Sequence, residues 1–413
     1  LLMNKEVLVI LIMSILLISM LNIFGMNIIR NFSNVVVGQE NQNASSAGYV
    51  KYTLDLVGNI LLNGNVPNVN NICPLIILYD PSNGYIYVAS PRADAITVIN
   101  GNTSTVIGSI YLGSSSTSMT CVSVTTNTAT SAFTNIVIYF PKGMAYDPQN
   151  GYIYVTADSA SLYIPHNIRH PATIFIINSK TNTVVGNITI GVYLTGVVYD
   201  PSNGYIYVGD CASKSVFVIN PETNTVVKNI SVGLHPYALT YDPQNGYIYV
   251  INLYSSTIAV INGETNTVVG NITVSSYPYA LTYDPSNGYI YVTVPLAKSV
   301  SVINPETNTV VKSISLVERP TWMAYDPQNG YIYVGNLFSN TVTVINGETN
   351  TIIGNISIGS CPIGMAYDPQ NGYIYVANSR ADIVSVINGE TNTVVENITV
   401  SSHQSAILYD PQN

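Results

Sequence analysis

The sequence predicts an all-β fold, a seven-bladed β-propeller of four-stranded antiparallel blades. The string Tyr-Asp-Pro-Ser/Gln-Asn-Gly-Tyr-Ile-Tyr-Val occurs seven times in the 413 residues, and an eighth copy is cut off at Asn413. From Asp200 onward the copies follow one another every 42 residues, which is the length of one four-stranded blade. Each unit also contains four short apolar runs separated by turn-forming residues.

The unit that begins at Pro236 illustrates the four expected strands. They read PYALTYD (236–242), GYIYVIN (246–252), STIAVIN (256–262) and NTVVGNITV (266–274). In the second and third strands both alternating sets of side chains are apolar, whereas a sheet with one wet face would alternate apolar and polar residues. Each sheet is therefore expected to be sandwiched between two neighbours, with its first strand lining a central channel.

Two kinds of tight turn join these strands. In Asp-Pro-x-Asn-Gly, proline presets φ and Asn-Gly supplies the positive φ that closes the turn. The turn between the third and fourth strands carries Gly263 in one unit and Pro221 in another. Because proline fixes φ near −65°, this position is not expected to need a left-handed glycine.

The blade count leaves two partial elements at the ends. A stretch that resembles a fourth strand, 54–64, precedes the first complete set, and one that resembles a first strand, 405–410, follows the last. Seven blades are predicted, and an eighth is expected if the chain belongs to a longer protein.

The amino-terminal segment is separate from the repeats. Residues 7–24 contain no charge, and this run is longer than the 7–15 residues typical of a signal peptide. We assign 1–30 to a transmembrane anchor or a signal peptide, 31–50 to a linker and 51–413 to the propeller. Both interpretations of 1–30 predict an exported protein that meets a membrane through this segment only.

The charge content excludes one class of partner. Only 8% of the residues are charged, the net charge is −9, and no basic block occurs. Binding to nucleic acid depends on clustered Lys and Arg, so no nucleic-acid partner is expected.

The repeat strings resemble the YVTN family of β-propeller repeats. The second strands end in YVIN (249–252), YVGN (333–336) and YVAN (375–378), and the strings TVxVIN and TNTVV follow them. The resemblance covers about 73–413 and implies a seven-bladed propeller of the type found in archaeal or bacterial surface-layer and cell-surface proteins. Other units carry YVAS, YVTA, YVGD and YVTV, so the family's asparagine is not present in every repeat.

The loops opposite the repeated turns are the predicted binding face, because variable loops on a repeated scaffold usually carry binding. The part of this face near the first two units, where both large insertions lie, is the best site candidate. Trp322 stands where other units carry Gly or Ala, so it either plugs the channel or binds a ligand. Two histidines in an insertion are either metal ligands or solvated loop residues. The candidate residues for this face are Trp322, Arg319, Glu318, Tyr237, Tyr277, His166 and His170.

Three other sets of residues are candidates for modification or binding. Cys73 and Cys361 occupy equivalent positions in the first and last blades, so they either form a disulfide that closes the ring or are free buried thiols. Turn aspartates, represented by Asp242, Asp284 and Asp326, either bind Ca²⁺ or accept hydrogen bonds within their own turns. Sequons for N-glycosylation occur at Asn31, Asn43, Asn102, Asn187, Asn229, Asn271, Asn355 and Asn397.

No catalytic set is recognisable, so an enzyme is not expected. The predicted function is an exported structural or adhesive cell-surface protein that acts on other surface proteins or glycans. The alternatives are a ligand-binding module and, less favoured, a lactonase- or lyase-like propeller enzyme. No cofactor is expected apart from Ca²⁺. The turn face is acidic and the opposite face carries most Lys and Arg, which predicts self-association through these two faces.

Overall fold

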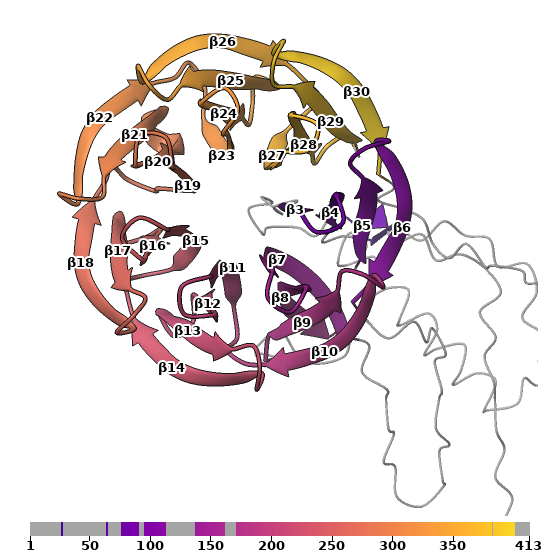
Figure 1. The fold of residues 1–413 in the computed structure, drawn as a ribbon, viewed down its shortest axis with the longest axis vertical. Helices are drawn as coiled ribbons and strands as arrows, with labels where there is room; N and C mark the ends of the chain where they lie inside the picture. The colour runs from indigo at the N-terminus through magenta and orange to yellow at the C-terminus, as the bar shows by residue number, and fades with distance from the viewer. Residues whose placement is uncertain are drawn as a thin grey trace, which may run out of the picture. The chain divides into compact units, whose positions relative to one another are not determined.

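The computed structural model describes residues 76–90, 95–112, 137–161, 171–381 and 383–400, together with 26–27 and 63–64. Seven four-stranded antiparallel sheets form the blades of a ring (Figure 1). The predicted seven-bladed β-propeller is therefore confirmed. The predicted segments 1–30 and 31–50 lie almost wholly outside the described residues.

Within each blade the strands follow one another in sequence order from the centre of the ring to its outside (Figure 1). Blades 1 to 3 consist of β3 (Ile76–Asp80), β4 (Tyr85–Ser90), β5 (Ala95–Asn100) and β6 (Thr105–Tyr111); β7 (Val137–Asp147), β8 (Tyr152–Ser161), β9 (Thr173–Asn178) and β10 (Thr183–Thr189); and β11 (Leu194–Asp200), β12 (Tyr205–Asp210), β13 (Ser215–Asn220) and β14 (Thr225–Ser231).

Blades 4 and 5 consist of β15 (Pro236–Asp242), β16 (Tyr247–Asn252), β17 (Thr257–Asn262) and β18 (Thr267–Thr273); and β19 (Leu281–Asp284), β20 (Tyr289–Val294), β21 (Ser299–Asn304) and β22 (Thr309–Ser315), with the 3-10 helix η1 (Pro295–Ala297) between β20 and β21. Blades 6 and 7 consist of β23 (Pro320–Asp326), β24 (Tyr331–Asn336), β25 (Thr341–Asn346) and β26 (Thr351–Ser357); and β27 (Pro362–Asp368), β28 (Tyr373–Asn378), β29 (Ile383–Asn388) and β30 (Thr393–Thr399). Two further strands, β1 (Met26–Asn27) and β2 (Asn63–Gly64), pair with each other.

The turn between the first and second strands forms as its sequence predicts. In blade 1, Oδ1 of Asp80 accepts the backbone N–H of Ser82 at 2.8 Å, and Oδ1 of Asn83 accepts that of Tyr85 at 2.9 Å. Gly84 has φ 71°, which closes the turn. In the second kind of turn the glycine does not have positive φ, and an asparagine such as Asn266, with φ 54°, takes the left-handed conformation instead.

Neighbouring blades are joined by apolar packing and by a repeated tyrosine. The second tyrosine of each Tyr-Ile-Tyr-Val string, such as Tyr207, is fully buried between blades. The hydroxyl of Tyr207 donates to the Gly263 carbonyl of the next blade at 3.3 Å and bonds to Oδ1 of Asn266 at 2.5 Å. The turn between the third and fourth strands thus supplies the acceptors for the tyrosine of the preceding blade, which fixes the distance between the two blades.

The structure corrects one expectation about charge. The turn aspartates of all seven blades are buried and do not contribute to an exposed acidic face. Each lies against the next blade; the phenol of Tyr199, for example, lies beside the carboxylate of Asp147. The buried aspartates are Asp80, Asp147, Asp200, Asp242, Asp284, Asp326 and Asp368.

The outer strand of every blade contains a β-bulge opposite the third strand. In blade 4 the register shifts between Val260 and Ile261, which leaves Val269 unpaired and exposed. A bulge increases the twist of an edge strand, which makes edge-to-edge pairing with another chain less favourable. In the part of the chain that the structure describes, no helix has the length and apolar character needed to cross a membrane.

Candidate functional site

The candidate site lies on the face opposite the repeated turns, which we call the top face. It is formed by the loops that enter each first strand and by the loops between second and third strands. Two positions in these loops vary strongly between blades. One is the seventh residue before the turn aspartate, and the other is the second residue after the second strand.

In blades 4, 5 and 6 these two positions carry mostly large apolar or aromatic side chains. Tyr254, Leu296 and Phe338 have exposed fractions of 58%, 53% and 58%, and Tyr277 is 44% exposed. We call the six residues the top-face arc: His235, Tyr254, Tyr277, Leu296, Arg319 and Phe338. Large side chains so exposed on adjacent blades are typical of an interaction surface.

The rings of the arc contact one another. The centroids of His235 and Tyr254 are 4.5 Å apart, and those of Tyr254 and Tyr277 are 5.8 Å apart with an interplanar angle of 76°. The guanidinium carbon of Arg319 lies 5.7 Å from the centroid of the Phe338 ring, within cation–π range. Burial lowers the pKa of His235, which favours the neutral imidazole.

Two residues of the arc have unusual backbone conformations. His235 has φ 63° and Tyr277 has φ 61°. Positive φ in a residue with a bulky side chain is strained and occurs preferentially at ligand-binding positions. Cys361, at the equivalent position of blade 7, has φ 63° as well, so positive φ at this position is a feature of the loop in three blades.

A second row of rings leads inward from the arc toward the centre of the ring. His235 lies 6.2 Å from Tyr237, Tyr237 lies 5.1 Å from Tyr279, and Tyr279 lies 6.0 Å from Trp322, measured between ring centroids. The hydroxyl of Tyr237 donates to that of Tyr279 at 3.2 Å. Burial raises the pKa of Tyr279 well above its usual value, so its phenol is neutral.

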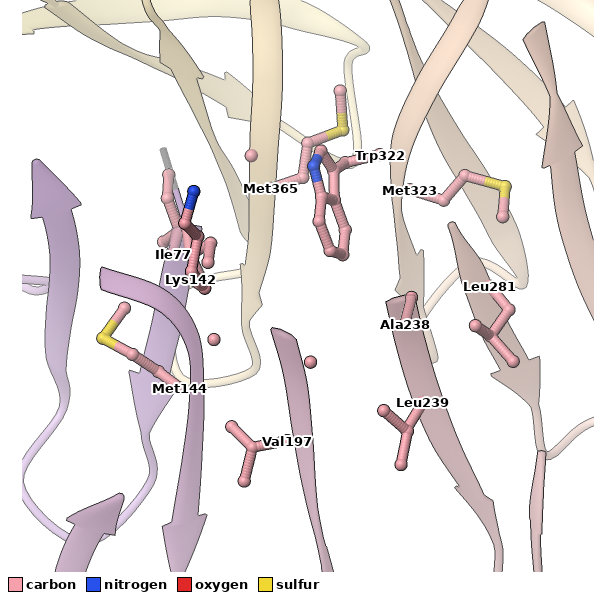
Figure 2. Close-up of a pocket in the computed structure, with 14 residues that line it drawn as sticks. Ile77, Lys142, Met144, Val197, Ala238, Leu239, Leu281, Trp322, Met323 and Met365 are labelled. Carbon is pink, nitrogen blue, oxygen red and sulfur yellow. The ribbon is translucent and has the colours of Figure 1, made fainter. Parts of the chain in front are cut away.

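The central channel contains a cavity of about 180 Å³ lined by the first strands of all seven blades. Figure 2 shows Trp322 and Lys142 among its lining side chains. Trp322 thus lines the channel, and whether it plugs the channel or binds a ligand stays a prediction. Its Nε1 is buried and, among the described residues, has no partner of good hydrogen-bond geometry, although Trp322 interacts with the phenol of Tyr279.

Lys142 is the charged side chain among the described residues that line the cavity. It belongs to blade 2, whose first two strands, β7 and β8, are longer than those of the other blades. Lys142 Nζ lies 3.8 Å from Oδ2 of Asp158, which stands on β8 opposite Phe140. Burial raises the pKa of Asp158 to about 6, and Lys142 opposes this shift. Burial, followed by the charge of Asp158, raises the pKa of the Cys211 thiol to about 12, so Cys211 is not an activated nucleophile.

Several predicted top-face residues are brought together and others are not described. Tyr237 and Trp322 belong to the inner row, whereas Tyr277 and Arg319 belong to the arc. Glu318 is half-buried on the same loop as Arg319. The candidate metal ligands His166 and His170 lie outside the described residues.

The five sequons of the outer strands share one geometry. Their asparagines are exposed, and the hydroxyl residue two positions later is exposed as well. These asparagines are Asn187, Asn229, Asn271, Asn355 and Asn397. Asn102 is also exposed, in a turn of blade 1, whereas Asn31 and Asn43 lie outside the described residues.

The remaining predictions are not tested. Cys361 is described and half-buried, but its proposed partner Cys73 is not described. Asp242, Asp284 and Asp326 stand in separate turns, where Oδ1 accepts a backbone N–H two residues ahead. No group of three or more metal-binding side chains is found among the described residues.

Sequence reasoning missed His235, Tyr254, Leu296 and Phe338 as members of one surface. A usable signal exists, because alignment of the repeats shows that the two variable loop positions become large or aromatic together in consecutive units. Their contact across two loops of one blade is visible only in the fold.

No family model and no curated protein matches the sequence. Among solved structures the chain is similar to Kuenenia stuttgartiensis hydrazine synthase, with a TM-score of 0.61 and 17% identity over 79% of this chain and 98% of that chain. It is also similar to dihydro-heme d1 dehydrogenase NirN in complex with DHE, with a TM-score of 0.53 and 14% identity over 78% of this chain and 65% of that chain. Similarity at this identity shows the β-propeller fold alone, and the YVTN family remains a prediction.

Proposed function

We propose that this protein is an exported cell-surface β-propeller that acts by binding other proteins or glycans through its top-face arc. The observation that carries the proposal is the arc itself, which places large, mostly exposed side chains on three adjacent blades, at loop positions that vary between otherwise repeated units.

Export and attachment at the cell surface are supported by the sequence. The uncharged segment 7–24 and the exposed sequons of the outer strands are both features of exported proteins. Glycans on Asn187 or Asn271 would cover the edge of an outer strand and leave the top-face arc accessible.

The test is binding of the full chain to a glycan array and to a protein array. We expect the double variant Tyr254→Ala with Tyr277→Ala to lose signal that the wild type shows. Tyr111→Ala is the matched control, because Tyr111 is 51% exposed on blade 1, away from the arc. Equal loss in the control, or no signal for the wild type on either array, contradicts the proposal.

A second candidate is an enzyme that uses the channel. It is favoured by Lys142, which lines the cavity, and by the carboxyl group of Asp158 beside it, since a carboxyl group with a raised pKa next to a lysine is a typical acid–base arrangement. Hydrolysis of a lactone and ester panel that is abolished by Asp158→Asn and by Lys142→Met, with folding unchanged, would support this candidate. Absence of turnover across the panel leaves the binding function as the better one.

A further inference from the structure

The face that carries the repeated turns, which we call the bottom face, remains acidic after its aspartates are buried. The turns between third and fourth strands carry an exposed glutamate in each of blades 3 to 7. These residues are Glu222, Glu264, Glu306, Glu348 and Glu390. The equivalent residue is Asn102 in blade 1 and Lys180 in blade 2, so the acidic surface covers one side of the ring.

The top face carries the opposite charge on nearly the same blades. Lys214, Lys298, Arg319 and Arg380 are exposed on blades 3, 5, 6 and 7. Glu318 is half-buried, and Asp210 is buried, with Oδ1 accepting the N–H of Tyr193 at 3.0 Å. Among the described residues, the exposed charge of the top face is therefore predominantly positive.

The two faces also match in their uncharged groups. Each Asp-Pro turn of the bottom face presents an exposed proline, as at Pro243, Pro285 and Pro327. The top face presents exposed rings, including Tyr254 and Phe338. Proline rings and aromatic rings are both largely apolar, so contact between them would bury apolar surface.

We propose that the partner of the top face is the bottom face of a second copy of this chain. The inference rests on the proposed function, since it names the protein that the top-face arc contacts. Discs would stack top to bottom about a common axis, with the glutamates of one copy above the cations of the next. Such a contact is heterologous, so each added copy leaves both outer faces free and the stack can continue.

The uneven charges also select the rotation between neighbouring discs. A stack without rotation places Glu306, Glu348 and Glu390 against the blades that carry Lys298, Arg319 and Arg380. Glu222 then also faces the blade of Lys214, so this arrangement matches four pairs, whereas every other rotation matches at most three. Because the pairs are exposed, their attraction falls as salt is added.

The experiment is sedimentation velocity of the full chain in a non-ionic detergent, at low and high salt. We expect stacks that grow with protein concentration at low salt and dissociate at 1 M salt, where the screening length is about 3 Å. The top-face variant Arg319→Glu with Arg380→Glu, and the bottom-face variant Glu348→Lys with Glu390→Lys, are each expected to be monomeric. Each variant is first shown to retain the wild-type melting temperature.

The decisive sample is an equimolar mixture of the two variants. The acidic top face of one variant can then contact the basic bottom face of the other, so stacks are expected to return. A single chain that carries all four substitutions is expected to form stacks as well. A wild type that is monomeric at low salt overturns the inference, and so do stacks that persist in either single variant. If stacking fails while Tyr254→Ala with Tyr277→Ala still abolishes array binding, the inference falls and the proposed function stands.

Discussion

The hydroxyl of Tyr375 in blade 7 donates a hydrogen bond of 2.9 Å to the carbonyl of Gly101 in blade 1, across 274 residues of sequence. Asn371 donates to the same carbonyl at 2.9 Å. The equivalent Tyr and Asn of blades 1, 3, 5 and 6 make the same pair of bonds to the next blade, so the ring closes with a junction that it also uses internally.

Removal of this donor tests the junction. Tyr375→Phe is expected to lower the free energy of unfolding by about 1 kcal/mol, the typical net contribution of one hydrogen bond. Tyr249→Phe is the matched control, because the next blade carries Pro305 in that turn and the Tyr249 hydroxyl bonds only to Asn245 within its own turn, at 3.1 Å. Urea denaturation measures both variants, and an equal loss in the control would contradict the role of the junction.

Acid is expected to stabilise the fold. Burial raises the pKa of Asp147, Asp242, Asp326 and Asp368, and raises that of Asp158 to about 6. The folded protein therefore holds these protons more tightly than the unfolded chain, whose aspartates have a pKa of about 3.9. The stabilisation is complete below that pH and is lost as pH rises through the folded-state pKa values.

The measurement is urea denaturation at pH 4, 5, 6 and 7, with a higher free energy of unfolding expected at pH 4 than at pH 7. His235 acts in the opposite direction, because its lowered pKa favours the neutral form and its contribution is lost on acidification. In Asp158→Asn the change between pH 5 and 7 is expected to be smaller than in the wild type. A wild type that loses stability from pH 7 to pH 4 would show this assignment of pKa directions to be wrong.

Strain at Tyr277 predicts an order of stability among three variants. Because φ at this position is 61°, the left-handed backbone conformation is about 1 kcal/mol less favourable for alanine than for glycine. Tyr277→Gly is therefore expected to be more stable than Tyr277→Ala by roughly that amount, while both lose the binding assigned to the top-face arc. Chemical denaturation gives the comparison, and Ala equal to or above Gly would refute a strained backbone.

Trp322 is the single tryptophan of the chain, so its fluorescence reports the mouth of the channel. Its half-buried ring is expected to be poorly quenched by acrylamide in the folded protein and strongly quenched in urea. Trp322→Gly introduces the residue that blades 2, 3 and 7 carry at this position. It is expected to lower the free energy of unfolding by roughly 2 kcal/mol, less than the loss caused by removing a fully buried tryptophan. Quenching equal to that of free tryptophan would contradict this burial.

The repeated parts of the fold follow from local sequence. Gly84 adopts positive φ because Asn-Gly closes the turn, and the strands around it alternate as their residues require. The burial of Asp147 does not follow locally, because the phenol beside it belongs to Tyr199 in the next blade. A count of acids along the sequence therefore overstates the charge of the bottom face.

The top-face arc was predicted only in part for a similar reason. Tyr277 and Arg319 could be recognised as candidates from their own loops. Tyr254 and Phe338 are recognised only from their contacts with residues of another loop. Repeat periodicity fixes which blade a residue belongs to. It does not show which side chains from different loops meet, because that depends on how the blades pack.

Each blade is one uninterrupted stretch of chain, and no described strand is exchanged between the two ends of the ring. Every described strand therefore finds its hydrogen-bonding partners among its immediate neighbours in sequence, which favours rapid folding through local contacts. The junction between blades 7 and 1 alone has to bring distant segments together, and loop-closure entropy opposes it. We expect the blades to assemble one after another during synthesis, with the joining of the last blade to the first as the slow final step.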